Sequence, residues 1–171
     1  MRRLIFALPF ALLVSALIAG EKKEEKKEDK DKLEVPSGFK IDIFAAAPEI
    51  DSAVSVATTP TGETIFICQD PLNVRCNESG TARLVKLVDT NGDGKADKIT
   101  VFADKVNAAR GMLYMDGTLY AMQQPFLTAY RDEDGDGVAE VKNVLVEGIG
   151  PTPEKVPPDH AVNGPRMAID G

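Results

Sequence analysis

From about residue 37 onward, the chain consists of short apolar runs, each ended by turn-forming residues. The runs are rich in β-branched and aromatic residues, and none has the 3.6-residue period of an amphipathic helix. We therefore expect an all-β fold. The predicted strands cover residues 39–46, 63–68, 82–88, 99–103, 118–122, 126–130 and 142–146.

Two sequence elements recur at a spacing that sets the expected architecture. Residues 89–94, DTNGDG, return 43 positions later as DEDGDG at residues 132–137, and the turn at 114–117 aligns with 168–171. A repeat of about 40–50 residues with four short strands has the size of a propeller blade. Residues 37–171 hold about three such repeats, whereas a closed ring needs at least about four. We therefore expect a partial β-propeller, an incomplete ring of about three blades, with a small β-sandwich as the alternative.

The first 36 residues have a different composition from the rest. Arg2 and Arg3 precede an apolar run that closes with Ala19 and Gly20. This layout is typical of a secretory signal peptide over residues 1–20, and the run is short for a spanning helix. Residues 21–34 are almost wholly Lys, Glu and Asp, which predicts a disordered charged linker over 21–36. We expect the domain at 37–171 to be exported, periplasmic or on the cell surface. An uncleaved first segment would be its only link to a membrane.

The charge balance narrows the class of partner. The formal net charge is −7 at pH 7. Binding to nucleic acid needs a basic surface that neutralises phosphates, so we expect no nucleic-acid partner. Acidic loops on an acidic surface favour divalent cations instead.

Both acidic repeats follow the DxDxDG pattern of calcium loops, in which alternate residues point inward and Gly permits a sharp turn. Their twelfth positions are Thr100 and Asn143, where an EF-hand has a bidentate Glu, so we expect weak structural sites in β-hairpins. The alternative is an Asp/Gly turn without metal. The expected ligands are Asp89, Asn91, Asp93, the carbonyl of Lys95, and Asp97 in the first loop, and Asp132, Asp134, Asp136, the carbonyl of Val138, and Glu140 in the second.

The two cysteines lie close together in the sequence. Cys68 ends a predicted strand and Cys76 lies in the following loop. In an exported protein such a pair can form a disulfide that constrains the loop, and two free thiols are the alternative. The sequence contains no Cys-x-x-Cys-His motif for haem attachment.

Three residues are candidates for a site at the propeller axis. His160 is the only histidine, lies near Arg166, and precedes a predicted inner strand. Arg110 precedes the equivalent strand of the previous repeat. His160 could act as a general base or ligand. The alternatives are a loop histidine bonded to the backbone and solvated surface arginines.

Several pieces of the sequence together resemble a known family. They are residues 38–46, Asp70–Pro71, 87–94 with 101–104, 130–132 with the following loop, and 159–171. In this order they are similar to the N-terminal β-propeller of the PVC-type membrane-bound dehydrogenase and haem-binding protein family. The resemblance spans nearly all of residues 37–171.

The resemblance implies a fold and an activity. The family is similar to soluble quinoprotein sugar dehydrogenases, whose six-bladed propellers hold pyrroloquinoline quinone and calcium over the axis. It implies oxidation of a carbohydrate or alcohol, with a cytochrome or quinone as electron acceptor and His160 in an axial role. Haem would belong to a C-terminal region that this sequence does not contain. The competing hypothesis is a non-catalytic, calcium-stabilised propeller that binds glycans or proteins, and the sequence leaves open whether the chain is an enzyme.

Overall fold

The computed structural model describes residues 34–72, 78–156 and 163–168. The chain divides into two units, Met1–Phe39 and Lys40–Gly171, and all the strands described below belong to the second. The predicted signal peptide and most of the predicted linker lie outside the described residues. The described part of the chain contains strands and turns and no helix, which confirms the prediction of an all-β fold.

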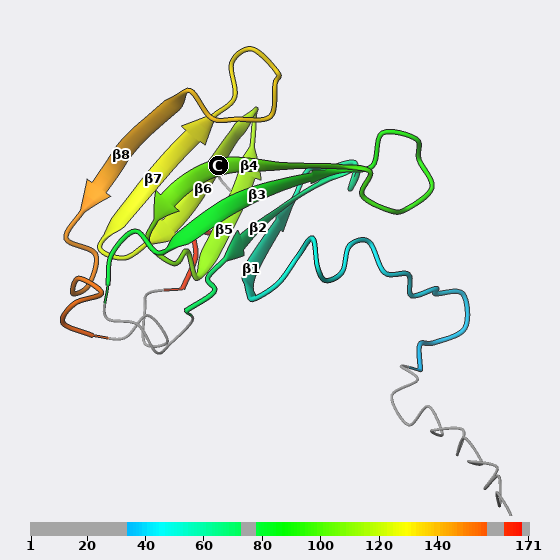
Figure 1. Cartoon of the computed structure of the whole chain (residues 1–171), viewed down its shortest axis with the longest axis horizontal. Helices are drawn as coiled ribbons and strands as arrows, with labels where there is room; N and C mark the ends of the chain where they lie inside the picture. Colours follow the sequence, from blue (N-terminus) through cyan, green and yellow to red (C-terminus); the bar gives the residue numbers. More distant parts are fainter. Residues whose placement is uncertain (1–33, 73–77, 157–162, 169–171) are drawn as a thin grey trace, which may run out of the picture. The chain divides into compact units, whose positions relative to one another are not determined.

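The strands form two antiparallel four-stranded sheets, each in simple up-and-down order (Figure 1). The first sheet contains β1 (Ala53–Thr58), β2 (Thr64–Gln69), β3 (Ala82–Val88) and β4 (Lys98–Val106). The second sheet contains β5 (Gly111–Met115), β6 (Thr118–Gln123), β7 (Phe126–Arg131) and β8 (Val141–Glu147).

Local turn chemistry accounts for the order within each sheet. The turn between β5 and β6 consists of Asp116 and Gly117, whose φ angles are 47° and 75°. Two successive residues with positive φ define a two-residue hairpin turn that matches the twist of its strands, and Asp-Gly is a favoured pair there. The hairpin closes with Met115 opposite Thr118. The copy of the repeated turn at residues 114–117 is therefore a tight hairpin.

The main core lies between the two sheets. Phe66 and Phe102 of the first sheet are buried together with Leu119 and Tyr130 of the second. The Phe66 ring meets Phe102 edge-on at 5.0 Å between centroids and stacks on Tyr114 at 5.2 Å. The first strands of the two sheets, β1 and β5, also lie against each other.

A smaller apolar cluster covers the other face of the first sheet. Ile67, Val85 and Leu87 are buried there beneath Phe44 and Ala45. The strand predicted over residues 39–46 is wrong, because those residues pair with no strand in the described part of the chain. Their alternating apolar pattern does not form a ladder. Instead Phe44 and Ala45 cover a sheet face.

The other six predicted strands agree with the structure, where they form β2, β3, β4, β6, β7 and β8. Two strands are absent from the predicted ranges. One is β1, whose sequence AVSVAT has few bulky apolar residues. The other is β5, which was expected only as the strand that follows Arg110. Arg110 directly precedes the strand β5.

Candidate metal centre

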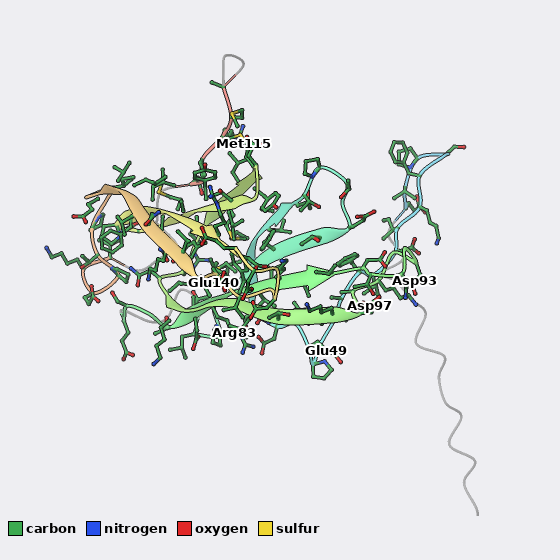
Figure 2. The ribbon with its side chains drawn as sticks, turned by 90° about the horizontal axis from the view of Figure 1, so that it is seen from above. Glu49, Arg83, Asp93, Asp97, Met115 and Glu140 are labelled. Carbon is green, nitrogen blue, oxygen red and sulfur yellow. The ribbon has the colours of Figure 1, made fainter. Side chains whose placement is uncertain are left out.

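The two acidic loops connect the third and fourth strands of their sheets. Residues 89–97 join β3 to β4, and residues 132–140 join β7 to β8. Figure 1 shows the first as the green loop beyond β3 and β4 and the second as the yellow loop beyond β7 and β8. In Figure 2, Asp93 and Asp97 lie together, well apart from Glu140. The sequence therefore predicted correctly that each loop closes a hairpin, and the two loops lie apart from each other.

The two loops share one internal hydrogen-bond pattern, position by position. In each loop the first aspartate accepts the N–H groups of the fourth and sixth residues, the third residue accepts that of the fifth, the fifth accepts that of the seventh, and the ninth accepts that of the second. In the second loop these bonds include Gly135 N to Asp132 Oδ1 at 2.7 Å, Gly137 N to Asp132 Oδ2 at 3.0 Å, Asp136 N to Asp134 Oδ1 at 3.0 Å and Glu133 N to Glu140 Oε2 at 2.7 Å. In the first loop they include Gly92 N to Asp89 Oδ1 at 2.7 Å, Gly94 N to Asp89 Oδ2 at 2.8 Å, Asp93 N to Asn91 Oδ1 at 2.9 Å and Thr90 N to Asp97 Oδ2 at 3.1 Å. Asp89 accepts two further N–H groups, from Asn91 and Asp93, both at 3.3 Å.

Glycine is required where each loop turns most sharply. Gly94 and Gly137 have φ angles of 85° and 101°, a region that residues with a Cβ rarely adopt. These are the sixth positions of the two DxDxDG motifs, where the sequence predicted that glycine permits the turn. A Cβ on Gly137 would also press on the Thr100 side chain of β4.

The second loop gathers four carboxylates at one point. One oxygen each from Asp132, Asp134, Asp136 and Glu140 lie within 4.8 Å of one another, and this cluster could bind a metal ion. Oxygens that bind one calcium ion at about 2.4 Å are at most about 4.8 Å apart, so the four donors are compatible with calcium in type and spacing. Their partial exposure leaves room for water to complete the coordination shell.

Three of the four carboxylates each keep one oxygen that accepts no hydrogen bond from a described residue, whereas both oxygens of Asp132 accept hydrogen bonds. Among the described residues, no hydrogen bond reaches Oδ2 of Asp134 or of Asp136, or Oε1 of Glu140. In the first loop, by contrast, Thr90 Oγ1 donates to Asp97 Oδ1 at 2.7 Å in addition to the amide on Oδ2. The first loop also has neutral Asn91 where the second has Asp134. The second loop therefore offers a cation more negative charge and more carboxylate oxygens that accept no hydrogen bond than the first loop does.

The second loop also contacts the first sheet, through β3 and β4. Lys86 of β3 approaches Asp132 Oδ2 with its Nζ at 2.8 Å, and their side chains are 21% and 8% exposed. Lys98 Nζ donates to the carbonyl of Asp136 at 3.2 Å, and Ala139 N donates to the carbonyl of Phe102 at 2.9 Å. The geometry of the second loop thus depends on how the two sheets pack.

These contacts set the pKa of the leading aspartates. Burial raises the pKa of Asp132, but the Lys86 ammonium and the amides of Gly135 and Gly137 outweigh it and hold that pKa below its usual value. The amides of Gly94 and Gly92 likewise hold the pKa of Asp89 below its usual value. Hydrogen bonds and opposite charge favour the ionised carboxylate, which is the form that binds metal.

Replacing Lys86 with methionine is expected to raise the pKa of Asp132 toward its ordinary value. In the native protein the depressed pKa stabilises the fold above the unfolded pKa of about 3.9, and this contribution is lost as pH falls through the folded value. Carboxyl chemical shifts recorded by NMR against pH in metal-free buffer measure the change. Lys40→Met, a surface lysine paired with Asp42, serves as the charge-matched control. An Asp132 titration identical in both variants would contradict the assignment.

Of the three residues predicted to lie at the propeller axis, Arg110 and Arg166 are among the described residues and His160 is not. Arg110 Nη2 lies 3.5 Å from Asp70 Oδ2, and the Asp70 side chain is 1% exposed, so the arginine is anchored by a buried carboxylate. Arg166 is exposed. His160 lies outside the described residues, and its axial role stays a prediction. Sequence reasoning missed Asp70 and Lys86 as partners, because 40 and 46 positions separate them from Arg110 and Asp132.

Of the two cysteines predicted to form a disulfide, only Cys68 lies among the described residues. Cys68 is buried completely, and its Sγ accepts the N–H of Ala109 at 3.2 Å. Burial raises the pKa of this thiol to about 11. Cys76 lies outside the described residues, so the Cys68–Cys76 disulfide stays a prediction.

Comparison with known proteins gives one match. The family model described as Domain of unknown function (DUF7133) matches residues 25–171. No curated protein and no solved structure matches the chain. In the described part of the chain, no helix has the length and apolar character needed to cross a membrane.

Proposed function

The chain belongs to the DUF7133 family, and we propose that it is a calcium-stabilised part of a β-propeller in an exported protein related to quinoprotein sugar and alcohol dehydrogenases. The observation that carries the proposal is the repeated acidic loop. Two successive four-stranded sheets each end in a DxDxDG hairpin with the same internal hydrogen bonds, and one loop gathers four carboxylates.

Two features of the backbone support a radial arrangement of blades. Each sheet is an up-and-down meander, and the first strands of the two sheets, β1 and β5, lie side by side, as inner strands around a central channel would. Gly164 lies so close to Gly111 of β5 that a Cβ on either glycine would overlap the backbone of the other. Gly164 precedes the third copy of the repeated turn, so this segment runs where a third inner strand would begin.

Calcium would act structurally in this proposal. Asp132, Asp134, Asp136 and Glu140 would hold it in the second loop, with the carbonyl of Val138 as a backbone ligand. The ion would supply positive charge that offsets repulsion among four clustered carboxylates. The loop's own hydrogen bonds orient those carboxylates beforehand. The first loop would hold a second ion through Asp89, Asn91, Asp93, Asp97 and the carbonyl of Lys95.

A calcium titration tests the site directly. Calorimetry on the metal-free chain is expected to show two sites, with dissociation constants near 10⁻⁴–10⁻³ M, the range of extracellular calcium modules. Asp136→Ala and Asp93→Ala occupy equivalent fifth positions, so each variant is expected to lose one site and keep the other. Wild-type protein that binds no calcium, or variants that both retain two sites, would contradict the proposal.

The dehydrogenase part of the proposal concerns the inner strands. Arg110 pairs with buried Asp70 directly before β5 and, in this proposal, would face a central channel. His160 as general base, Arg166 beside it, pyrroloquinoline quinone, and a cytochrome or quinone acceptor complete the proposed redox site. The test supplies the quinone, calcium, a panel of sugars and alcohols, and a reducible dye to the whole gene product. Absence of dye reduction, together with glycan or protein binding, would favour the non-catalytic propeller.

A further inference from the structure

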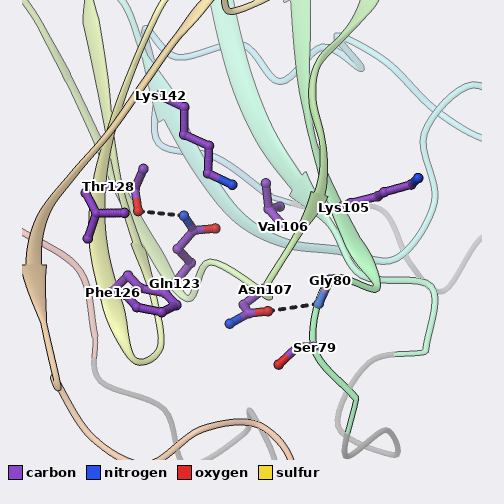
Figure 3. Close-up of a pocket in the computed structure, with 10 residues that line it drawn as sticks. Ser79, Gly80, Lys105, Val106, Asn107, Gln123, Phe126, Thr128 and Lys142 are labelled. Atoms are coloured by element: carbon purple, nitrogen blue, oxygen red, sulfur yellow. Dashed lines mark hydrogen bonds between the residues drawn. The ribbon is translucent and has the colours of Figure 1, made fainter.

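A cavity of about 320 Å³ opens between the outer strands of the two sheets (Figure 3). It is bounded by the end of β4 at Lys105 and Val106 and by the β6–β7 turn at Gln123 and Phe126. These residues lie at the ends of β4 and β7 opposite to those from which the acidic loops leave. Its volume is near the lower end of the range of small-molecule sites, which predicts a small ligand.

One hydrogen-bond acceptor in the cavity is held in a fixed direction. Gln123 is 3% exposed, and its Nε2 donates to Thr128 Oγ1 and to Tyr130 Oη, both at 2.7 Å. Burial raises the pKa of Tyr130 to about 12, so its hydroxyl stays neutral at ordinary pH. Because both amide protons are engaged, Oε1 of Gln123 is the group left to interact with a ligand, and Figure 3 shows it turned toward the open space.

The cation of the cavity is Lys142. Its side chain projects from β8, and Nζ lies above the Tyr130 ring, 6.0 Å from the centroid. In Figure 3 its ammonium is directed into the cavity, whereas that of Lys105 points away. None of the described residues that line the cavity is acidic. One carboxylate, Glu154, adjoins the rim, where it accepts a hydrogen bond from Ser79.

The rim of the cavity is braced by Asn107. Asn107 Oδ1 accepts the N–H of Gly80 at 2.8 Å, and its Nδ2 donates to the carbonyl of Gln124 at 2.7 Å. The same side chain therefore ties the loop before β3 to the β6–β7 turn. This bracing holds the two walls of the cavity at a fixed separation, so the site is formed before a ligand arrives.

We propose that this cavity is a binding site for a small hydroxylated carboxylic acid, of the class of uronic acids. The carboxylate pairs with the Lys142 ammonium, and a ligand hydroxyl donates to Oε1 of Gln123. The side chains of Val106, Phe126 and Val144 contact the C–H surface of the ligand. A cavity with a cation, a fixed acceptor and no lining carboxylate selects such an anion even though the whole chain has a net charge of −7.

Calorimetric titration of the full chain with sodium glucuronate tests the proposal. We expect one site, binding at least about tenfold weaker for glucose and for acetate, and the same affinity in EDTA, because the cavity lies apart from the acidic loops. Lys142→Met is expected to weaken binding about tenfold or more, since a charge-assisted hydrogen bond is lost.

Two further variants separate charge in the cavity from charge in general. Lys142→Arg keeps a cation at this position and is expected to retain binding. Lys40→Met removes one positive charge elsewhere and is expected to bind as the wild type does. The proposal is overturned if Lys142→Met binds glucuronate as tightly as the wild type, if glucose binds equally well, or if the wild type binds glucuronate with a dissociation constant above about 1 mM.

Discussion

Replacing Phe66 with alanine is expected to lower the free energy of unfolding by about 3–5 kcal/mol. Phe66 is 2% exposed and lies between the two sheets, where it contacts the rings of Phe102 and Tyr114. The substitution removes a ring from water-free surroundings and leaves a cavity between sheets that cannot fully collapse. A shift of the urea unfolding midpoint, followed by circular dichroism, measures the loss.

The same substitution at an exposed phenylalanine serves as the control, because it removes a ring that does not pack in the core. Phe39 is 72% exposed, so Phe39→Ala is expected to change stability by no more than about 0.5 kcal/mol. If the two variants unfold at the same urea concentration, Phe66 does not join the sheets as described. Because natural domains have only about 5–15 kcal/mol of stability, Phe66→Ala is expected to remain folded at low temperature but with a much reduced margin.

Removal of calcium is expected to cause the second large loss of stability. A ligand that binds only the folded state stabilises it by about 2.7 kcal/mol per site when its concentration is 100 times its dissociation constant. The melting temperature of the chain should therefore fall on addition of EDTA and recover with excess calcium. Magnesium at the same concentration should restore less, because it demands a smaller and more regular oxygen shell than these loops offer.

One variant in each loop separates the stabilisation that calcium provides through that loop. Asp136→Ala should lose the part of the calcium gain that comes from the second loop, whose contacts with Lys86, Lys98 and Phe102 link the two sheets. Asp93→Ala should lose the smaller part, since Asp97 of the first loop is already engaged by Thr90. A melting curve that is unchanged by EDTA would contradict the calcium assignment, whatever the variants do.

Much of the fold follows from short-range features of the sequence. Apolar runs without helical period predicted strands, and the structure confirms an all-β fold with those runs in β2, β3, β4, β6, β7 and β8. The DxDxDG motifs predicted two hairpin loops, and in the structure each of these segments connects two antiparallel strands. These features are readable because strand alternation and turn geometry depend on neighbours within a few residues.

One strand prediction was wrong because the local pattern has no strand to pair with in the described part of the chain. Residues 39–46 alternate like a strand, yet Phe44 and Ala45 cover the face formed by Ile67, Val85 and Leu87. A strand requires another edge to hydrogen-bond, and the alternation alone does not tell whether an edge is present. The strand β1 shows the converse, because it forms against β2 despite a weak apolar pattern.

The sequence by itself therefore determined most of the strands, the hairpin turns and the types of side chain in the acidic loops. Only the tertiary structure decided that Lys86 would meet Asp132, that Asp70 would anchor Arg110, and that Gln123 and Lys142 would face one cavity. The physical reason is that the first set depends on backbone conformation over a few residues. The second set depends on how two twisted sheets pack, which brings together side chains that are tens of residues apart.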